Sequence, residues 1–438
     1  VTFTRASSAT YVGADGLIKT TPVNLFIYSE EFDNVAWLKS KASITPNAVA
    51  DPNGSLTADK LVANVASGEH EISRVFTVTS GKTYTGSIYV KAAELTEVRF
   101  GFTTTNFSSP TRGVFDLTTG SAVESYNTIT YVGDGWYRIT VTNTATGSGS
   151  ANLFLNLLSG GAQVFTGDGT SGVYIWGAQL EEGSTASEYI PTGATISGAP
   201  RFDHDPATGE SLGLLIEEAR TNLIPYSSPA NPWWNKFELS SVDVSVDNPF
   251  NYSSVRRHRA TTVLNTHYFD RRPDSTFLSA DTDYTFSAFV APEGTGVDAG
   301  KMQLRVFQIG QNSASINFDL NAGQSNAHSG TSGTSSNGVT WSVSDYGMQP
   351  YADGWYRVWM TFRSSLICSV GIVSINSLNS PDYQIPGYAS DGTGGYYVAG
   401  IQVEQGTFRT SVIPTDGATA TRAADVCTVT NSNIYDTD

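Results

Sequence analysis

The chain repeats a long pattern, and this internal repeat constrains the fold more than any other feature of the sequence. Three landmarks recur in the same order: Asn-Leu followed by Tyr-Ser, a Gly-Trp-Tyr-Arg run, and an Asp-Gly-Thr turn that leads to Ile-Pro-Thr. They begin at Asn24, Gly135 and Asp168 in the first copy, and at Asn222, Gly354 and Asp391 in the second. Two copies of one sequence unit predict two copies of one fold.

Within each copy the apolar residues alternate with polar ones, as in half-buried antiparallel strands. Tyr137, Ile139 and Val141 share one face, and the run from Tyr356 to Phe362 repeats the pattern. Turn dipeptides such as Asp-Gly separate the runs, and long helical periodicity is nearly missing. The sequence therefore predicts an all-β chain with two repeated β-sandwich domains of the jelly-roll kind.

The repeat also sets the expected domain boundaries. The first jelly-roll module is expected at residues 21–197 and the second at residues 222–415, each long enough to bury its own core. Residues 1–20 form an N-terminal strand segment, residues 198–221 a connector, and residues 416–438 a C-terminal segment.

Composition excludes several classes of partner. The chain has 41 Asp and Glu against 25 Lys and Arg, a net charge of −16, which repels nucleic acid and anionic membrane surfaces. No apolar stretch approaches the roughly 20 residues of a membrane span. Cys368 lies in an apolar run and is expected to be a buried free thiol, although a bridge to Cys427 stays open.

The Gly-Trp-Tyr-Arg runs supply the first candidates for a binding surface. Five side chains project from the face opposite the apolar one: Trp136, Arg138, Trp355, Arg357 and Trp359. Aromatic rings on a sheet face can stack on sugars, and arginine can bond hydroxyls or carboxylates. The alternative is structural, with each tryptophan packed under a loop and the arginine stacked on it or paired with a glutamate.

A second pair of candidates recurs at the same spacing. His70 and Arg74 in the first copy match His267 and Arg271 in the second, and residues four apart share one face of a strand. They could line a ligand groove or form a structural hydrogen-bonded set. Five histidines without clustered carboxylates make a transition-metal site unexpected.

The last long strand of each copy contains a Gly-x-Gln-x-Glu pattern. Glu181 and Glu404 are weak candidates for a structural calcium site, and no other cofactor is expected. The alternatives are a solvated edge or a pairing with Arg138 and Arg357. Gly177 and Gly400 in mid-strand predict a bulge or a close backbone approach.

Acidic residues elsewhere do not form a recognisable catalytic pattern. Asp203, His204 and Asp205 precede a turn, where acids usually make local Asx hydrogen bonds. Glu217 and Glu218 are adjacent and point to opposite faces of a strand, whereas glycoside hydrolysis needs two carboxylates across a cleft. With no hydrolase or phosphate-binding motif in the chain, we expect no enzyme activity.

Two stretches carry a resemblance to a known class of protein. They run from Phe3 to Tyr11 (FTRASSATY) and from Gly213 to Leu223 (GLLIEEARTNL), and the module landmarks accompany them. Together they resemble bacteriophage virion proteins of the tail-fibre, tailspike and head-fibre type, with carbohydrate-binding-module-like (concanavalin-like) jelly rolls. In that class the two stretches are expected to lie close together. We therefore expect residues 1–20 to pair with residues 198–221, with the first module as an insertion between them.

The resemblance implies a function in the virion. It suggests a structural and adhesive component, a fibre, spike or decoration protein, with modules for attachment to a host surface glycan. Its expected partners are other virion proteins and further copies of itself, for which a trimer is the first guess. A purely structural assembly protein without a glycan ligand is one alternative, and a polysaccharide depolymerase is a second.

Overall fold

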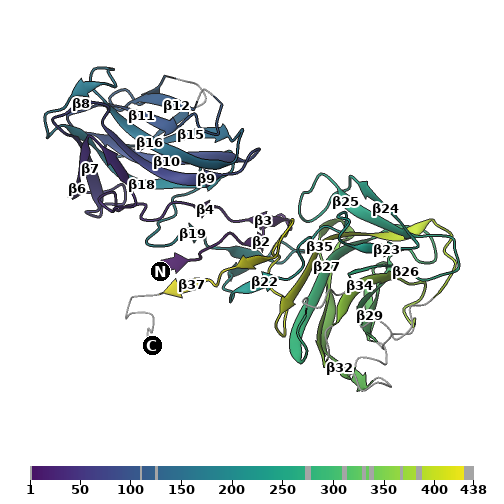
Figure 1. Cartoon of the computed structure of the whole chain (residues 1–438). Coiled ribbons are helices and arrows are strands. Elements are labelled where there is room, and N and C mark those ends of the chain that lie inside the picture. Colours follow the sequence, from purple (N-terminus) through teal and green to yellow (C-terminus); the bar gives the residue numbers. More distant parts are fainter. Residues whose placement is uncertain are drawn as a thin grey trace, which may run out of the picture. The chain divides into compact units, whose positions relative to one another are not determined.

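The alternating runs form antiparallel strands throughout the computed structural model of the chain (Figure 1). The structure describes residues 2–108, 111–123, 127–271, 278–307, 313–327, 332–334, 340–365, 368–380 and 387–428. Among these residues the one helical element is the 3-10 turn η1 (Ala352–Gly354). No helix in this part of the chain is long and apolar enough to cross a membrane. The all-β prediction is confirmed.

The chain divides into two units, which do not follow the chain order. The first module contains Phe3–Ser8 and Pro22–Ala199. The second module contains Val1–Thr2, Ala9–Thr21 and Pro200–Asp438. The short segment Ala9–Thr21 therefore belongs with residues that follow it by almost 200 positions.

The first module is a sandwich of two six-stranded antiparallel sheets, ordered β14-β15-β10-β18-β7-β6 and β13-β12-β11-β16-β9-β5. The chain crosses repeatedly from one sheet to the other, as in a jelly roll. Its strands are β4 (Val23–Asn24), β5 (Leu38–Ser40), β6 (Ala42–Val49), β7 (Ala58–Ala63), β8 (Ser67–Gly68), β9 (Glu71–Val78), β10 (Thr83–Ala92), β11 (Glu97–Phe102), β12 (Arg112–Asp116), β13 (Ser121–Ala122), β14 (Asn127–Gly133), β15 (Trp136–Thr144), β16 (Gly149–Leu158), β17 (Phe165–Thr166), β18 (Gly172–Glu182) and β19 (Ser197–Gly198). Strand β1 (Thr2–Thr4) spans the boundary between the two units.

The second module repeats this sandwich with a six-stranded sheet, β23-β26-β34-β28-β29-β30, and a seven-stranded sheet, β24-β25-β35-β27-β33-β32-β31. Its strands are β2 (Thr10–Val12), β3 (Ile18–Thr20), β20 (Phe202–His204), β21 (Ser211–Leu214), β22 (Arg220–Asn222), β23 (Asn235–Phe237), β24 (Leu239–Val244), β25 (Val255–Ala260), β26 (His267–Arg271), β27 (Thr282–Gly294), β28 (Lys301–Phe307), β29 (Ser313–Asp319), β30 (Gln324–Ala327), β31 (Ser332–Thr334), β32 (Thr340–Pro350), β33 (Tyr356–Ser364), β34 (Ser369–Ser374), β35 (Gly394–Gln405), β36 (Ala420–Arg422) and β37 (Val426–Thr428).

Each module buries a core between its sheets. In the first module Phe100, Phe115 and Ile139 belong to it, and in the second Phe286, Val358 and Ile372 do. Apolar residues at every second position of the strands supply these side chains, as the alternation predicts. Cys368 is buried in the second core as a free thiol, and Cys427 is exposed, so the open disulfide alternative is not realised. Burial raises the pKa of the Cys368 thiol to about 12.

The repeated Asn-Leu pair has a structural cause. The Asn24 side chain donates to the carbonyls of Ala178 and Ile190 and accepts the N–H groups of Phe26 and Leu180. Asn222 makes the equivalent four contacts in the second module. One buried amide thus joins the first strand of each copy to β18 or β35 and to the segment that follows it, satisfying backbone groups that would otherwise be unpaired.

A buried cluster of hydrogen bonds around Arg201 joins segments of the second module that are far apart in the sequence. Arg201, which is fully buried, donates to the Thr10 carbonyl (3.0 Å), to Glu217 (2.6 Å) and to Asp425. The backbone N–H of Val12 donates to Asp203 at 2.7 Å. The structure thus places Thr10–Val12 against the connector that follows the first module, within one unit.

The adjacent acids Glu217 and Glu218 lie between β21 and β22 and not on a strand as predicted, but their environments differ. The side chain of Glu217 is 12% exposed and paired with Arg201, whereas that of Glu218 is 57% exposed. Asp205 makes the expected local turn bonds to the N–H groups of Ala207 and Thr208.

Candidate functional site

The two tryptophans of the Gly-Trp-Tyr-Arg runs are not available to a ligand. Trp136 and Trp355 are each 1% exposed on the outer face of their sheet. Their indole N–H groups donate to the carbonyls of Ala50 (3.2 Å) and Asp247 (2.8 Å). Of the two alternatives, the structure has the structural one: a loop covers each ring.

The arginines of the same runs differ between the modules. Arg138 stacks over Tyr89 and donates to the Ser187 carbonyl (2.6 Å) and to Ser87 Oγ (2.9 Å). Arg357 stacks over Phe289 and donates to Ser287 Oγ at 3.1 Å. Arg138 therefore has a structural set of partners, and Arg357 lines a cavity that is described below.

Trp359 has a different environment again. Its ring is half-buried, its N–H donates to Asp345 at 2.8 Å, and the guanidinium of Arg409 lies 4.0 Å from the ring centroid. A cation already covers one face of the indole, so Trp359 does not present that face to a ligand.

The repeated histidines are structural. Both ring nitrogens of His70 lie against backbone carbonyls, those of Lys41 and Phe165, and His267 lies in the same way between Glu238 and Tyr388. Both rings are fully buried, so of the two alternatives the structure has the hydrogen-bonded set.

Arg74 and Arg271, the arginines four residues after these histidines, were the other two candidates for lining a ligand groove. Arg74 packs its guanidinium over the rings of Phe26 and Trp37, inside the first module. The side chain of Arg271 lies outside the described residues.

The calcium candidates are likewise used for internal bonds. Glu181 accepts the amide of Gln179 (2.6 Å) and the N–H and hydroxyl of Ser187. Glu404 bonds Gln402 (2.8 Å) and Thr410 in the same way. Both carboxylates are at least 98% buried, with 2% and 0% exposure. Among the described residues no group of three or more His, Cys, Asp or Glu is placed to hold a metal ion.

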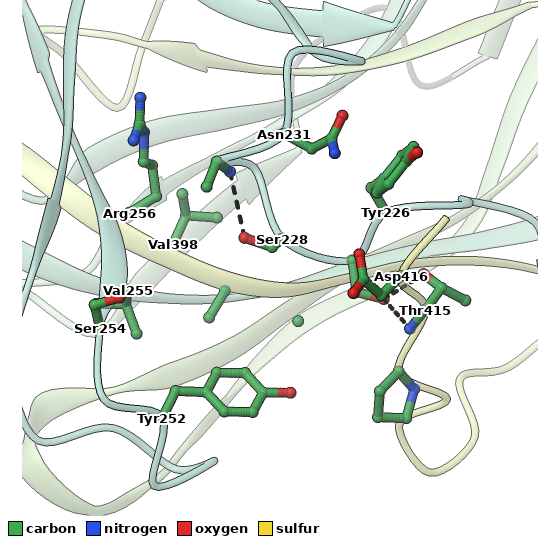
Figure 2. A pocket seen from close by; sticks show the side chains of 15 residues that line it. Tyr226, Ser228, Asn231, Tyr252, Ser254, Val255, Arg256, Val398, Thr415 and Asp416 are labelled. Atoms are coloured by element: carbon green, nitrogen blue, oxygen red, sulfur yellow. Dashed lines mark hydrogen bonds between the residues drawn. The ribbon is translucent and has the colours of Figure 1, made fainter. Parts of the chain in front are cut away.

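The strongest candidate for a binding site is an open hollow of about 540 Å³ in the second module. Its floor is the outer face of β25 and β35, and loops around Tyr226, Tyr252 and Asp416 form its walls. Figure 2 shows Tyr226 and Tyr252 on opposite sides of the hollow, with Asp416 next to Tyr226. The volume lies within the range of about 300–1,000 Å³ that small-molecule pockets occupy.

A bulge in β35 positions one wall. The pairing of β27 with β35 shifts register between Ser287 and Phe289, and Gly400 at the bulge has φ 55°. The first module has the same bulge at Gly177, so the expectation of a mid-strand irregularity is confirmed. A Cβ at Gly400 would collide with the ring of Phe250, and Tyr252 stacks on that ring with centroids 4.9 Å apart. Glycine is needed there so that Phe250 can support Tyr252.

The repeat shows why the hollow is open in this module. The strand register makes Ala399 the equivalent of Trp176, since these residues face Phe289 and Tyr89 respectively. In the first module Trp176 packs against Tyr189 at 4.6 Å, and Tyr189 bonds Ser29 and Glu30. In the second module an alanine and Val412 stand at the positions of Trp176 and Tyr189. Two large aromatic side chains are thus replaced by small ones.

The polar groups around the hollow are arranged for recognition. Asp416 is exposed, and within the described residues its carboxylate has no hydrogen-bond partner. The Asn231 carbonyl oxygen accepts the N–H of Trp233 at 2.9 Å, which fixes the amide while its NH₂ group has no partner in the described part of the chain. Arg256 donates to Ser241 and Asp243, so its stem, not its charge, lines the hollow. Burial raises the pKa of the Tyr252 hydroxyl, which therefore stays protonated at neutral pH.

Sequence reasoning missed this site. Tyr252, Asn231 and Asp416 lie in loops without periodicity, and they were not among the predicted residues. One signal was present in the sequence. The two copies align around Gly177 and Gly400, and the residue before this glycine is Trp176 in the first copy but Ala399 in the second.

Comparisons with known proteins place limits on inference from similarity. No protein-family model matches the chain. No curated protein matches it in sequence. Among solved structures, the N-terminal CBM22-1-CBM22-2 tandem domain of Paenibacillus barcinonensis Xyn10C is similar with a TM-score of 0.32 and 10% identity, covering 87% of this chain and 98% of that one. A similarity this low carries no argument about function, so the proposals below depend on this chain's own residues.

Proposed function

We propose that the chain is an adhesive protein whose second module binds a saccharide in the hollow between Tyr226 and Tyr252. The observation that carries the proposal is the difference between the modules. In the first module Trp176 packs against Tyr189, whereas Ala399, which stands at the position of Trp176, lines the hollow of the second module. An open hollow of about 540 Å³ between two tyrosine rings is suited to a ligand with both apolar and hydroxyl surfaces.

The surrounding groups match the chemistry of sugars. A pyranose presents C–H groups on its faces and hydroxyls at its rim, and tyrosine offers an apolar ring with a polar end. The Asp416 carboxylate can accept hydroxyl protons, and the Asn231 amide can donate to hydroxyl oxygens. The half-exposed Tyr252 ring rests on Phe250, which restricts its motion before a ligand arrives.

We also propose that the hollow binds without bond cleavage. Asp416 is the one carboxylate among the residues that line it, whereas glycoside hydrolysis uses two. Asp203 and Glu217 line a separate cavity together, and burial raises the pKa of Asp203. Glu217 is already bonded to Arg201, Arg422 and Ser411, which leaves it unsuited to act as base or nucleophile.

The virion assignment is part of the same proposal. It is supported by the stretches around Arg5–Tyr11 and Gly213–Leu223, which resemble phage fibre and spike proteins. In such a particle the chain would contact other virion proteins and host glycan, and display in a homotrimer would combine weak sites into avidity. Sedimentation of the purified chain at its own mass of 46.8 kDa, instead of three times that mass, would contradict the trimer.

A glycan screen followed by calorimetry tests the binding proposal. We expect the full chain to bind at least one host surface saccharide, and Tyr252→Ala to weaken that binding by about tenfold or more, roughly 1.4 kcal/mol, because one ring face is lost. Tyr346→Ala is the matched control, since Tyr346 is 39% exposed in the same module outside the hollow. The same mixtures are expected to release no oligosaccharide.

Two results would overturn parts of this account. A screen that is blank across host and related sugars would remove the adhesive function and leave the purely structural virion protein. Release of oligosaccharide by the wild-type chain would favour the depolymerase.

A further inference from the structure

A second cavity, of about 260 Å³, lies within the second module. Residues of the N-terminal segment, the connector and the seven-stranded sheet line it. Thr10–Val12, Asp203 and His204 contribute to its lining, and so do Arg357 from β33 and Arg409. It shares no lining residue with the hollow between Tyr226 and Tyr252.

Arg357 is buried in the lining of this cavity with unused donors. It is 5% exposed, and Nη2 donates to Ser287 Oγ at 3.1 Å. Within the described residues, Nε has no partner, and Nη1 has no hydrogen bond. In the first module the equivalent Arg138 donates through Nη1 to the Ser187 carbonyl at 2.6 Å. Arg357 therefore lacks an acceptor that its repeat has.

Arg409 is a second cation in the same lining and is specific to this module. The residue at the equivalent position of the first module is Ala186, by alignment of Ser187 with Thr410. Arg409 stacks on Trp359 and donates through Nη2 to Gln349 Oε1 at 2.6 Å, while its Nε has no partner in the described part of the chain. Burial, and then the charge of Arg357, lowers the pKa of Arg409 to about 10, so it remains charged at neutral pH.

The charges around the cavity favour an anion. Two acids line it, and Glu217 is compensated by Arg201 and Arg422. Asp203 accepts the Val12 N–H, and its one charge faces two arginines. A guanidinium donates hydrogen bonds and accepts none, so a ligand between Arg357 and Arg409 must supply acceptors. Planar guanidinium groups match carboxylate and phosphate oxygens in geometry as well as in charge.

We propose that the cavity between Arg357 and Arg409 binds a small oxyanion, the carboxylate of an acidic sugar or a phosphate group, as a site separate from the tyrosine-lined hollow. The two guanidinium groups share the anion, and Gln349 and Trp359 hold Arg409 in place for it. This site does not depend on the proposed saccharide hollow, because neither cavity supplies a residue to the other.

Calorimetric titration of the full chain with sodium phosphate, sodium glucuronate and glucose tests the proposal. We expect phosphate or glucuronate to bind, and glucose to show no binding that depends on Arg409. Arg409→Ala, which restores the first module's residue, is expected to weaken anion binding at least tenfold. Arg363→Ala is the matched control, since Arg363 is on β33 like Arg357 and does not line the cavity. Tyr252→Ala should leave anion binding unchanged.

The outcomes are distinct. Glucuronate binding alone identifies an acidic sugar as the ligand source, and phosphate binding alone identifies a phosphate group. No binding of either anion, or binding that Arg409→Ala leaves intact, overturns the proposal. If Arg409→Ala changes the thermal midpoint of the protein without anion, Arg409→Gln replaces it in the test, because glutamine keeps a polar side chain against Trp359. The proposal then requires Arg409→Gln to weaken anion binding at least tenfold.

Discussion

Asp425→Ala is expected to lower the free energy of unfolding of the second module by about 3–5 kcal/mol, the usual effect of removing one partner of a buried ion pair. The side chains of Arg201 and Asp425 are both fully buried and bonded to each other. Arg201 also bonds Glu217, Ser411 and the Thr10 carbonyl. The loss of Asp425 leaves a buried guanidinium with one carboxylate instead of two.

The cluster matters because it joins four parts of the chain. It links the N-terminal segment, the connector after the first module, the end of the sandwich and the C-terminal segment through Arg201, Glu217, Ser411 and Asp425. Burial alone would raise the pKa of Glu217, but Arg422, Ser411 and Arg201 outweigh burial and hold it below its ordinary value. Glu217 therefore remains ionised beside Arg422 and Arg201.

Chemical denaturation followed by tryptophan fluorescence measures this effect. Glu218→Ala is the matched control, because Glu218 pairs with Arg220 at the surface and its removal should cost less than about 1 kcal/mol. Equal unfolding curves for Asp425→Ala and Glu218→Ala would show that the cluster does not hold the closing segments.

The second large effect is a dependence of stability on pH that arises from His258. This residue on β25 is fully buried, its ring stacks on Phe269 at 4.5 Å, and neither ring nitrogen has a partner among the described residues. Burial, and then the charges of Lys236 and Arg256, lowers the pKa of His258 to about 3. The folded module therefore holds this ring neutral.

The sign follows from proton linkage. Between about pH 6.5 and pH 3 the unfolded chain binds a proton at His258 that the folded chain does not. The free energy of unfolding is unaffected by protonation of His258 above about pH 6.5. Below that pH, protonation of His258 in the unfolded chain lowers it by about 1.4 kcal/mol for each pH unit. We expect His258→Phe, which keeps the stacking on Phe269, to unfold with a shallower pH dependence by that amount between pH 6 and pH 4. Parallel pH profiles for wild type and variant would contradict the buried neutral ring.

Much of the architecture could be predicted from the sequence because it depends on periodic features. The alternation around Tyr137 and Tyr356 predicts strands, and the repeat predicts two sandwiches. The outer-face position of Trp136 and Trp355 also follows from alternation. What covers these rings does not, because the covering groups, Ala50 and Asp247, lie in loops whose path depends on tertiary packing.

The candidate site shows the same limit more strongly. Ala399 in place of Trp176 can be read from the repeat, but a missing side chain leaves space only if no neighbour fills it. The ring of Phe250 lies over Gly400 and fills part of that space. Tyr252 stacks on Phe250 and forms a wall of the hollow. The histidine and glutamate candidates failed for the opposite reason: backbone groups already use their polar atoms. The carbonyls that contact His70 and His267 lie far away in the sequence, and the N–H groups that contact Glu181 and Glu404 lie in the loop after the same strand.

The most direct test of the central proposal is a structure of the full chain with the saccharide found by the glycan screen. We predict a sugar ring in the second module, against Tyr252, with hydroxyls bonded to Asp416 and Asn231, and no sugar at Trp176 and Tyr189 of the first module. A saccharide bound elsewhere while the hollow between Tyr226 and Tyr252 stays empty would contradict the account.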